Sequence, residues 1–481
     1  MRLMLCFLAA GLAAADVTVE QVNKAIGLEL FADANLWDDD AKAVAGRLNW
    51  PQESETTNDA SYRLYPKDDY RLFECRPYSC AFISEQGKPS TFSLMFANKG
   101  DAVSISAKDV ADKTKAKVRD EQIKDYKKAI ASDAKDLEEK LTKLFGKPAA
   151  DRMGQGGKTS EVVRRWDWNG HAFLLAAPKD EYVALRIVSL KSADEGGRTR
   201  VTDAELFARA KTRVDRRANG DVVLKDIPMV DQGPKGYCAP ATWERAMRYM
   251  GIPADMYVLA MAGQSGAGGG TSVAALAAGA KDAVTRGGRK IETTNVKIDP
   301  ANVAKYIDRG LPIMWAMFST KQYNEIANGR TKEREGMTDP AAWKKAVADA
   351  RKGQKPLQPN RNEGHVCMII GYNKETGEVA VSDSWGPNYE ERWIHGAEAT
   401  QVSQGSLTII GFSRAGRGET ARGHVGTVTR GQGRRRGRAK WQISGGARAG
   451  PGLGLGKREA RRLGGVDDDR RRSFTSSLRR L

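Results

Sequence analysis

The sequence is poor in the residues that build metal sites and disulfide scaffolds. It has five cysteines and four histidines in 481 residues, and no group of them has the spacing of a zinc site. Five cysteines are also too few for a fold that depends on disulfides. After the N-terminus, no stretch reaches about 18 consecutive apolar residues, so no membrane span is expected there. We therefore expect a globular protein that needs no metal and no cofactor.

Nucleotide-binding signatures are absent as well. The glycine-rich run at 263–271, GQSGAGGGT, lacks the Lys-Ser/Thr of a phosphate loop and the ribose-binding acid of a dinucleotide fingerprint. Its flanks have helical patterns, so we expect a loop between two helices, which either lines a cleft or is a plain connection. No DNA- or RNA-binding module is recognisable, and we expect no specific nucleic-acid partner.

Positive charge is concentrated at the C-terminal end. Residues 415–481 hold 18 Lys+Arg and 5 Asp+Glu, so they carry 18 − 5 = +13 of the net charge of +18 and leave +5 for residues 1–414. With one tryptophan and few other aromatics, this segment cannot bury enough surface to order itself. We predict a disordered basic tail, which is either a solvated extension or makes weak contact with an anionic surface.

The first residues have the pattern of an export signal. Met1–Ala15 combines one arginine, an apolar run and three alanines before the expected cleavage site after Ala15. The alternative is a buried N-terminal helix. A signal peptide at 1–15 predicts a protein exported to the periplasm or the extracellular space.

Residues 16–215 have the pattern of an α+β domain. Strand-like segments occur near 62–65, 71–73, 80–83 and 91–96, and an amphipathic charged helix is predicted over 108–145. A hairpin turn is expected at Asn169-Gly170. The role of this domain stays open between substrate recruitment and an inhibitory pro-segment that cleavage releases. The run RRANGD at 216–221 is typical of a linker.

Two cysteines of this domain are close in sequence. Cys75 and Cys80 lie in ECRPYSC, where Pro77 and the five-residue separation suit a bridged turn. An exported protein could form this disulfide, although a bridge closing so small a loop would stabilise little. The alternative is a pair of reduced thiols.

The clearest chemical signal is the stretch Met229–Tyr249, MVDQGPKGYCAPATWERAMRY. A turn-forming run separates Gln232 from Cys238, and a pattern of helical period follows the cysteine. We therefore expect Cys238 at a loop-to-helix junction, with Pro240 in the first helical turn. The free N–H groups and the positive end of the helix dipole favour a thiolate there. A lone cysteine can equally be a small buried hydrophobe, so partners are needed.

Two downstream segments supply those partners. Gly364–Tyr372, GHVCMIIGY, is predicted to be a buried strand that opens at His365, and 365 − 238 = 127 residues separate this histidine from Cys238. The segment VAVSDSWG at 379–386 is a second predicted strand, which ends at Asp383, and 383 − 238 = 145 residues separate it from the cysteine.

These pieces resemble a papain-like cysteine peptidase, in which a His and an Asn follow the Cys by about 130–150 residues. Papain has Asn-Ser-Trp-Gly where this chain has Asp-Ser-Trp-Gly at 383–386. The Cys-His-Asp set is similar to the branch that includes bacteriocin-processing double-glycine peptidases and their secreted bacterial relatives. The resemblance covers about residues 216–414.

Each residue type suits a role in acyl transfer. Cys238 would be the nucleophile and His365 the base, which then protonates the leaving amine. Asp383 would hold the imidazole tautomer and stabilise its cation. Gln232 would donate an N–H to the developing oxyanion, together with the backbone N–H of Cys238. The resemblance implies that Trp385 shields the His–Asp contact; ordinary core packing is the alternative.

The other thiol near His365 is expected to be inert. Cys367 lies two residues after His365 and so on the same strand face, and we interpret it as a small buried hydrophobe.

The sequence therefore predicts an α+β chain in which a separate α+β domain at 16–215 precedes a papain-like peptidase domain at 216–414. In that domain, a helix carrying the cysteine packs on an antiparallel sheet carrying His and Asp. The predicted function is an exported cysteine peptidase that acts on peptides or proteins through an acyl-enzyme. Alternatives are an amidase or acyl transferase on cell-wall peptides, and an inactive peptide-binding module.

Overall fold

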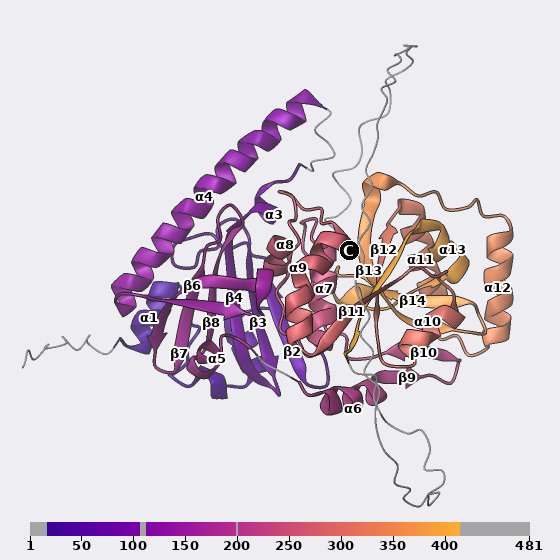
Figure 1. The fold of residues 1–481 in the computed structure, drawn as a ribbon, viewed down its shortest axis with the longest axis horizontal. Coiled ribbons are helices and arrows are strands. Elements are labelled where there is room, and N and C mark those ends of the chain that lie inside the picture. Colours follow the sequence, from indigo (N-terminus) through magenta and orange to yellow (C-terminus); the bar gives the residue numbers. More distant parts are fainter. Residues whose placement is uncertain (1–16, 106–111, 199–200, 414–481) are drawn as a thin grey trace, which may run out of the picture. The chain divides into compact units, whose positions relative to one another are not determined.

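Two antiparallel β-sheets organise the part of the chain that the computed structural model describes, residues 17–105, 112–198 and 201–413 (Figure 1). These residues belong to one compact unit. The predicted signal peptide at 1–15 and the predicted basic tail at 415–481 lie outside the described residues.

The first sheet is built from a continuous part of the chain. Its eight strands lie in the spatial order β1-β2-β3-β4-β8-β7-β6-β5, and every neighbouring pair is antiparallel. The strands are β1 (Gln52–Glu55), β2 (Asp59–Leu64), β3 (Ser79–Glu85), β4 (Lys88–Asn98), β5 (Ala149–Gly154), β6 (Ser160–Trp168), β7 (His171–Ala176) and β8 (Tyr182–Ser189).

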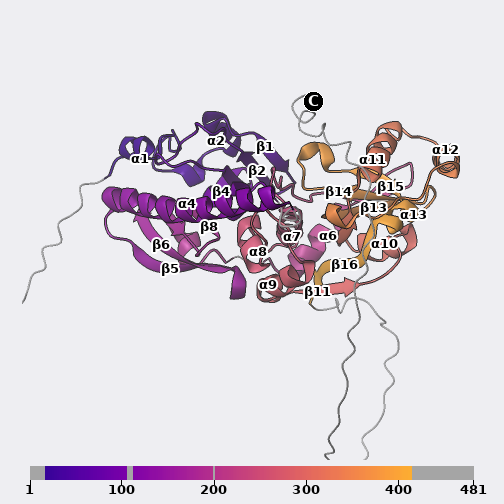
Figure 2. The ribbon, with the colours of Figure 1, turned by 90° about the horizontal axis from the view of Figure 1, so that it is seen from above.

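The helix α4 (Lys113–Phe145) lies along one face of this sheet, as both views show (Figure 1, Figure 2). It buries Tyr126, Ile130, Leu137 and Leu141, at four- and seven-residue steps of the predicted apolar stripe. Asp112 caps its N-terminus. The other helices of this region are α1 (Val19–Ile26), α2 (Ala41–Leu48), α3 (Lys99–Ala102), α5 (Leu190–Asp194) and α6 (Asp203–Arg213).

Both faces of the first sheet are covered. Along β7 and β8, alternate side chains point to opposite faces, and one set joins the core beneath α4. The other set joins a second core, to which α7 (Cys238–Tyr249) and α8 (Met256–Ala262) contribute from the C-terminal region. Two covered faces explain why β7 and β8 read as nearly continuous apolar runs. The shared core contains Met95, Ala172, Leu174, Tyr182, Ala184, Val188, Val230, Tyr237, Ala241, Met256, Tyr257 and Ala260.

The second sheet has the spatial order β11-β16-β12-β13-β10-β9, and β14 and β15 branch from β13. Every pair in it is antiparallel, and the predicted strands at 313–318 and 364–372 are present. The strands are β9 (Val214–Arg216), β10 (Asp221–Leu224), β11 (Arg289–Thr294), β12 (Ile313–Phe318), β13 (Gly364–Asn373), β14 (Glu378–Ser382), β15 (Arg392–His395) and β16 (Ser403–Phe412).

The helices of the C-terminal region enclose this sheet and form its core with it. After α7 and α8 they are α9 (Val273–Arg286), α10 (Pro300–Ile307), α11 (Lys321–Glu333), α12 (Pro340–Lys352) and α13 (Gly396–Val402). Among the described helices, none combines the length and apolar character needed to cross a membrane. The α+β class and the position of the peptidase-like part after another α+β region agree with the sequence prediction.

Three local predictions were wrong. Residues 71–73 do not form a strand, because Phe73 and Glu74 have positive φ and turn the chain. The predicted linker at 216–221 is instead the turn of a β9–β10 hairpin, in which Gly220 takes the left-handed conformation. The predicted Cys75–Cys80 bridge is not formed. Both thiols are free and buried, Cys75 in the turn and Cys80 within β3, where its side chain packs in the core beneath α4.

Candidate active site

Cys238 lies where the sequence predicts it, at the start of a helix. It is the first residue of α7, Tyr237 is the N-cap, and Pro240 falls in the first turn. The thiol is half-buried, while the residues that follow it in α7 are mostly buried. The backbone N–H of Ala239 contributes to lowering the pKa of this thiol. A helix N-terminus with a reachable thiol is a suitable place for a thiolate.

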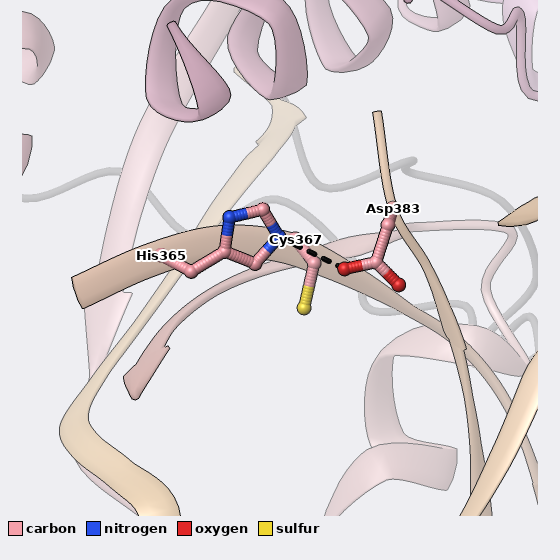
Figure 3. Close-up of side chains that lie close together, drawn as sticks. All are labelled: His365, Cys367 and Asp383. Carbon is pink, nitrogen blue, oxygen red and sulfur yellow. Dashed lines mark hydrogen bonds and ion pairs between the residues drawn. The ribbon is translucent and has the colours of Figure 1, made fainter. Parts of the chain in front are cut away.

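The histidine and the aspartate come together at the ends of two adjacent strands. His365 is the second residue of β13, and Asp383 directly follows β14. Atom Nε2 of His365 lies 2.8 Å from Oδ1 of Asp383, a contact drawn in Figure 3. The imidazole also interacts with the thiol of Cys238, since each side chain shifts the pKa of the other toward its charged form. Since Nε2 contacts the carboxylate, Nδ1 is the ring atom left for the sulfur. The structure thus brings all three predicted residues together.

Hydrogen bonds and charge shift both partners toward the ion pair. Burial alone would raise the pKa of Cys238, but the hydrogen bond and positive charge of His365 hold it below its ordinary value. Burial alone would lower the pKa of His365, yet its bonds to Asp383 and Cys238 raise that pKa to about 9. Both shifts favour the thiolate–imidazolium pair over the neutral pair.

Arg392 holds the aspartate from the other side. It is the first residue of β15, and its Nε and Nη2 lie 3.0 and 2.6 Å from Oδ2 of Asp383. Both side chains are buried. Burial would raise the pKa of Asp383, but the charge of Arg392 and the bond to His365 keep it below the usual range. The carboxylate stays ionised and has one oxygen for each partner.

The insertion before His365 supports this arginine. Nη1 of Arg392 donates to Oδ1 of Asn324, at 3.0 Å, and to Oδ1 of Asn328, at 2.9 Å, both on α11. This insertion comprises residues 319–362, between β12 and β13. Through α11, it supports the position of Asp383.

Trp385 lies against the imidazole of His365. The ring centroids of Trp385 and His365 are 4.7 Å apart, and Trp385 is half-buried. On its other side, the guanidinium of Arg392 lies 5.2 Å from the indole centroid. This position suits the shielding role that the resemblance implies.

Two side chains of α7 fix the nucleophile helix to the strands that carry its partners. Thr242 donates its hydroxyl to the carbonyl of Val366, next to His365, at 2.9 Å. Arg245 is fully buried and donates to the carbonyl of Pro228 at 2.9 Å and to Oγ of Ser382 at 2.5 Å. These contacts across the fold help to set the separation of Cys238 and His365.

Gln232 lies on the loop that leads into α7. Its backbone N–H donates to the carbonyl of Ser384 at 2.9 Å, so this loop is tied to the segment that follows Asp383. Its side-chain Nε2 donates to the carbonyl of Lys235 at 3.0 Å. An amide nitrogen has two N–H groups, which leaves one for a ligand. Its part in an oxyanion hole stays a prediction.

Cys367 is buried within β13, as expected. It also belongs to the one group of possible metal ligands found among the described residues. His365, Cys367 and Asp383 each place one ligand atom within 4.8 Å of the others. The donor set fits a cation poorly, because Arg392 already occupies the second oxygen of Asp383. Burial also raises the pKa of Cys367 well above its ordinary value, which keeps the thiol protonated.

The other described histidines have structural positions. His171 lies in an aromatic cluster of the first sheet, and His395 caps α13. Asn388, which follows the strand end like Asp383, is exposed. Sequence reasoning missed Arg392 and Arg245. For Arg392, the local signal in the sequence is its place shortly after Asp383 and Trp385. For Arg245, the surrounding sequence gives no signal.

Comparison with known proteins agrees with this geometry. Residues 224–403 match the sequence profile of the Peptidase_C39 like family, and this range includes Gln232, Cys238, His365, Asp383 and Trp385. No curated protein matches the chain. With its helix-borne cysteine and strand-borne histidine, the C-terminal region is a C39-like domain of papain-like cysteine peptidase type.

Proposed function

We propose that the protein is a cysteine peptidase that hydrolyses peptide bonds through Cys238, His365 and Asp383. One observation carries this proposal: His365 contacts Asp383 with one ring nitrogen, at 2.8 Å, and interacts with Cys238 closely enough to lower the pKa of that thiol. That is the arrangement of a nucleophile, a base and a group that orients the base.

In the acylation half-reaction, the Cys238 thiolate attacks the carbonyl carbon of the scissile peptide. A C–S bond forms, and the carbonyl electron pair moves onto oxygen, where Gln232 and the Cys238 backbone N–H would donate to it. As the tetrahedral intermediate collapses, the C–N bond breaks and His365 gives its proton to the leaving amine. The products are a free amine and a thioester.

In the deacylation half-reaction, the now neutral His365 accepts a proton from water as the hydroxide oxygen attacks the thioester. The C–S bond breaks, the peptide acid leaves, and the thiolate–imidazolium pair is restored. Asp383 stays ionised throughout, because Arg392 and the imidazole both stabilise its charge.

The proposal is tested by removing the thiol. Cys238→Ala should lower peptide hydrolysis to background with an unchanged melting temperature. Cys367→Ala is the matched control, because this thiol lies two residues from His365 but is protonated, and it should retain most of the activity. Hydrolysis that survives in Cys238→Ala would overturn the assignment.

The acceptor and the compartment belong to the same proposal. We propose that water is the acceptor and that the protein acts outside the cytoplasm on peptides or proteins. Hydrolysed products without transfer to added amines would support the first point. Intact mass measurement of protein from its native host, with loss of residues 1–15, would support the second.

A further inference from the structure

The loop that carries Gln232 is held by a buried lysine. Nζ of Lys235 donates to the backbone carbonyl of Gln232 at 2.8 Å, and the side chain of Gln232 donates back to the carbonyl of Lys235. These two bonds close the loop on itself. The Lys235 side chain has no solvent exposure, so its charge needs a partner inside the protein.

The partners of Lys235 come from the N-terminal region and from α8. Oδ1 of Asp101, on α3, lies 3.2 Å from Nζ, and this carboxylate is also nearly inaccessible. The rings of Tyr65 and Tyr257 face the ammonium group at 4.6 and 5.4 Å from their centroids. Tyr65 also donates its hydroxyl to the carbonyl of Asp231, next to Gln232, at 2.5 Å.

Strand β1 fixes the segment just before this loop. The backbone N–H of Met229 donates to Oγ of Ser54 at 2.9 Å, and that of Asp231 donates to Oε1 of Glu53 at 2.7 Å. Both acceptors are buried side chains of a short strand at the edge of the first sheet. The chain entering the active site is therefore aligned by the N-terminal sheet.

The residue before the nucleophile also packs on the N-terminal region. A Cβ at Gly100, on α3, would lie 2.5 Å from the ring of Tyr237, so only glycine allows this approach. On the other side of the loop, Gly236 pairs with Gly269 of the glycine-rich run, whose neighbour Gly268 donates to the Lys99 carbonyl. The glycine-rich run thus backs this loop.

We propose that Asp101 and Tyr65 are positioning residues for Gln232, acting through Lys235 and the 231–236 loop, and that the N-terminal region is a permanent part of the active site. This inference rests on the proposed peptidase function. Of the two roles that the sequence left open, it excludes the inhibitory pro-segment that cleavage releases. Release of the N-terminal region would leave the Lys235 charge without Asp101 and would expose the Tyr237 and Tyr257 rings. The region is therefore not a removable pro-segment.

The first test replaces one carboxylate in the full-length chain. Asp101→Asn keeps the size of the side chain but removes the charge that faces Lys235. We expect kcat to fall about 10- to 100-fold, because a displaced Gln232 no longer donates its N–H to the oxyanion of the transition state. KM should change less than about twofold. The rate of Cys238 alkylation by iodoacetamide should stay as in the parent, because Cys238 and His365 are untouched.

A double variant separates positioning from stability. In Asp101→Asn/Lys235→Met neither charge is left unpaired, so the melting temperature lost in Asp101→Asn should return. The bond from Lys235 to Gln232 is still missing, so kcat should stay low. Recovery of kcat together with the melting temperature would show that the ion pair is only structural and would overturn the proposal.

The control is the same substitution at an exposed ion pair of the same region. Lys127 and Asp180 lie 3.2 Å apart with side chains 46% and 43% exposed, and Asp180→Asn should leave kcat unchanged. Backbone hydrogen exchange of residues 232–237 gives a readout that needs no activity. Exchange should accelerate in Asp101→Asn and not in Asp180→Asn; equal rates in both would overturn the positioning role. Faster exchange with no Cys238-dependent hydrolysis in the parent would instead refute the proposed function alone.

Discussion

The two sheets each bury a histidine at the start of a central strand, and the two imidazoles behave in opposite ways. His171 opens β7 in the first sheet, and His365 lies at the start of β13 in the second. Burial lowers the pKa of His171, whereas the partners of His365 raise its pKa to about 9. The first is a neutral ring and the second is a cation at neutral pH.

The difference lies in what faces each ring. His171 is surrounded by Phe31, Trp37 and Trp168, with centroids 4.9 to 5.5 Å away, and its Nε2 has no hydrogen-bond partner among the described residues. His365 faces a carboxylate and a thiol. Burial by itself makes a histidine an aromatic core residue; a buried carboxylate beside it makes a base.

The largest effect is expected from replacing the imidazole of His365 by an apolar ring, which removes the titratable group that distinguishes it from the neutral His171. His365→Phe should lower kcat/KM at least about 10³-fold, which corresponds to roughly 4 kcal/mol of transition-state stabilisation. The new ring can still stack on Trp385, so the fold should persist. Steady-state kinetics with a circular dichroism control measures both. A folded variant with more than a tenth of parental activity would mean that His365 is not the base.

The next largest effect is expected from removing the charge of Arg392, which pairs with Asp383. Arg392→Gln should lower the free energy of unfolding by about 3–5 kcal/mol, because it leaves the buried Asp383 carboxylate with one oxygen unpaired. Urea denaturation measures this loss. Arg217→Gln is the matched control, because it breaks a pair with Glu391 whose side chains are 36% and 29% exposed, and it should cost about 1 kcal/mol or less.

A smaller effect is expected from a change that lowers the pKa of His365 and so makes it more like His171. Asp383→Asn keeps the shape but removes the charge beside His365, so the pKa of His365 should fall from about 9 by about 1–3 units. The alkaline limb of the pH–rate profile should move to lower pH by the same amount. An alkaline limb that stays near pH 9 would show that Asp383 does not raise the pKa of the base.

The smallest effect is expected in the first sheet. His171→Phe should leave kcat unchanged and alter the free energy of unfolding by about 1 kcal/mol or less at pH 7, since it exchanges one weak hydrogen bond for an apolar ring in an aromatic cluster. Below pH 6.5, the unfolded parent binds a proton that folded His171 resists, so the parent should lose stability relative to the variant as pH falls. Parallel stability curves for the two proteins would contradict a neutral His171.

His365 should show the reverse pH dependence. Because its pKa rises on folding, its contribution is complete below about pH 6.5 and is lost as pH rises through about 9. Comparing the unfolding free energies of the parent and His365→Phe between pH 6 and 9.5 measures this term. A gap between them that does not shrink toward alkaline pH would contradict the raised pKa.

The sequence was sufficient to find the three residues that the structure brings together, because cysteine and histidine are rare in this chain and Cys238, His365 and Asp383 have a recognisable order and spacing. It was insufficient for Arg245 and Arg392, because an arginine in a charged segment looks like a surface residue until its distant partners are known. Strand β1 was also missed, since the run QESE is polar and its two middle side chains are buried as hydrogen-bond acceptors.

The chain order of the two sheets has a consequence for biosynthesis. Every strand of the first sheet lies between residues 52 and 189, so this sheet can be complete before Cys238 leaves the ribosome. The second sheet cannot close until β13, its central strand, has been made, because β10 and β12 both pair with it. We therefore expect the nascent helix α7 to dock on a finished N-terminal surface, with His365, Asp383 and Arg392 arriving afterwards in that order. During synthesis, Cys238 would thus lie in a helix that is already packed before His365, which lowers its pKa, has been made.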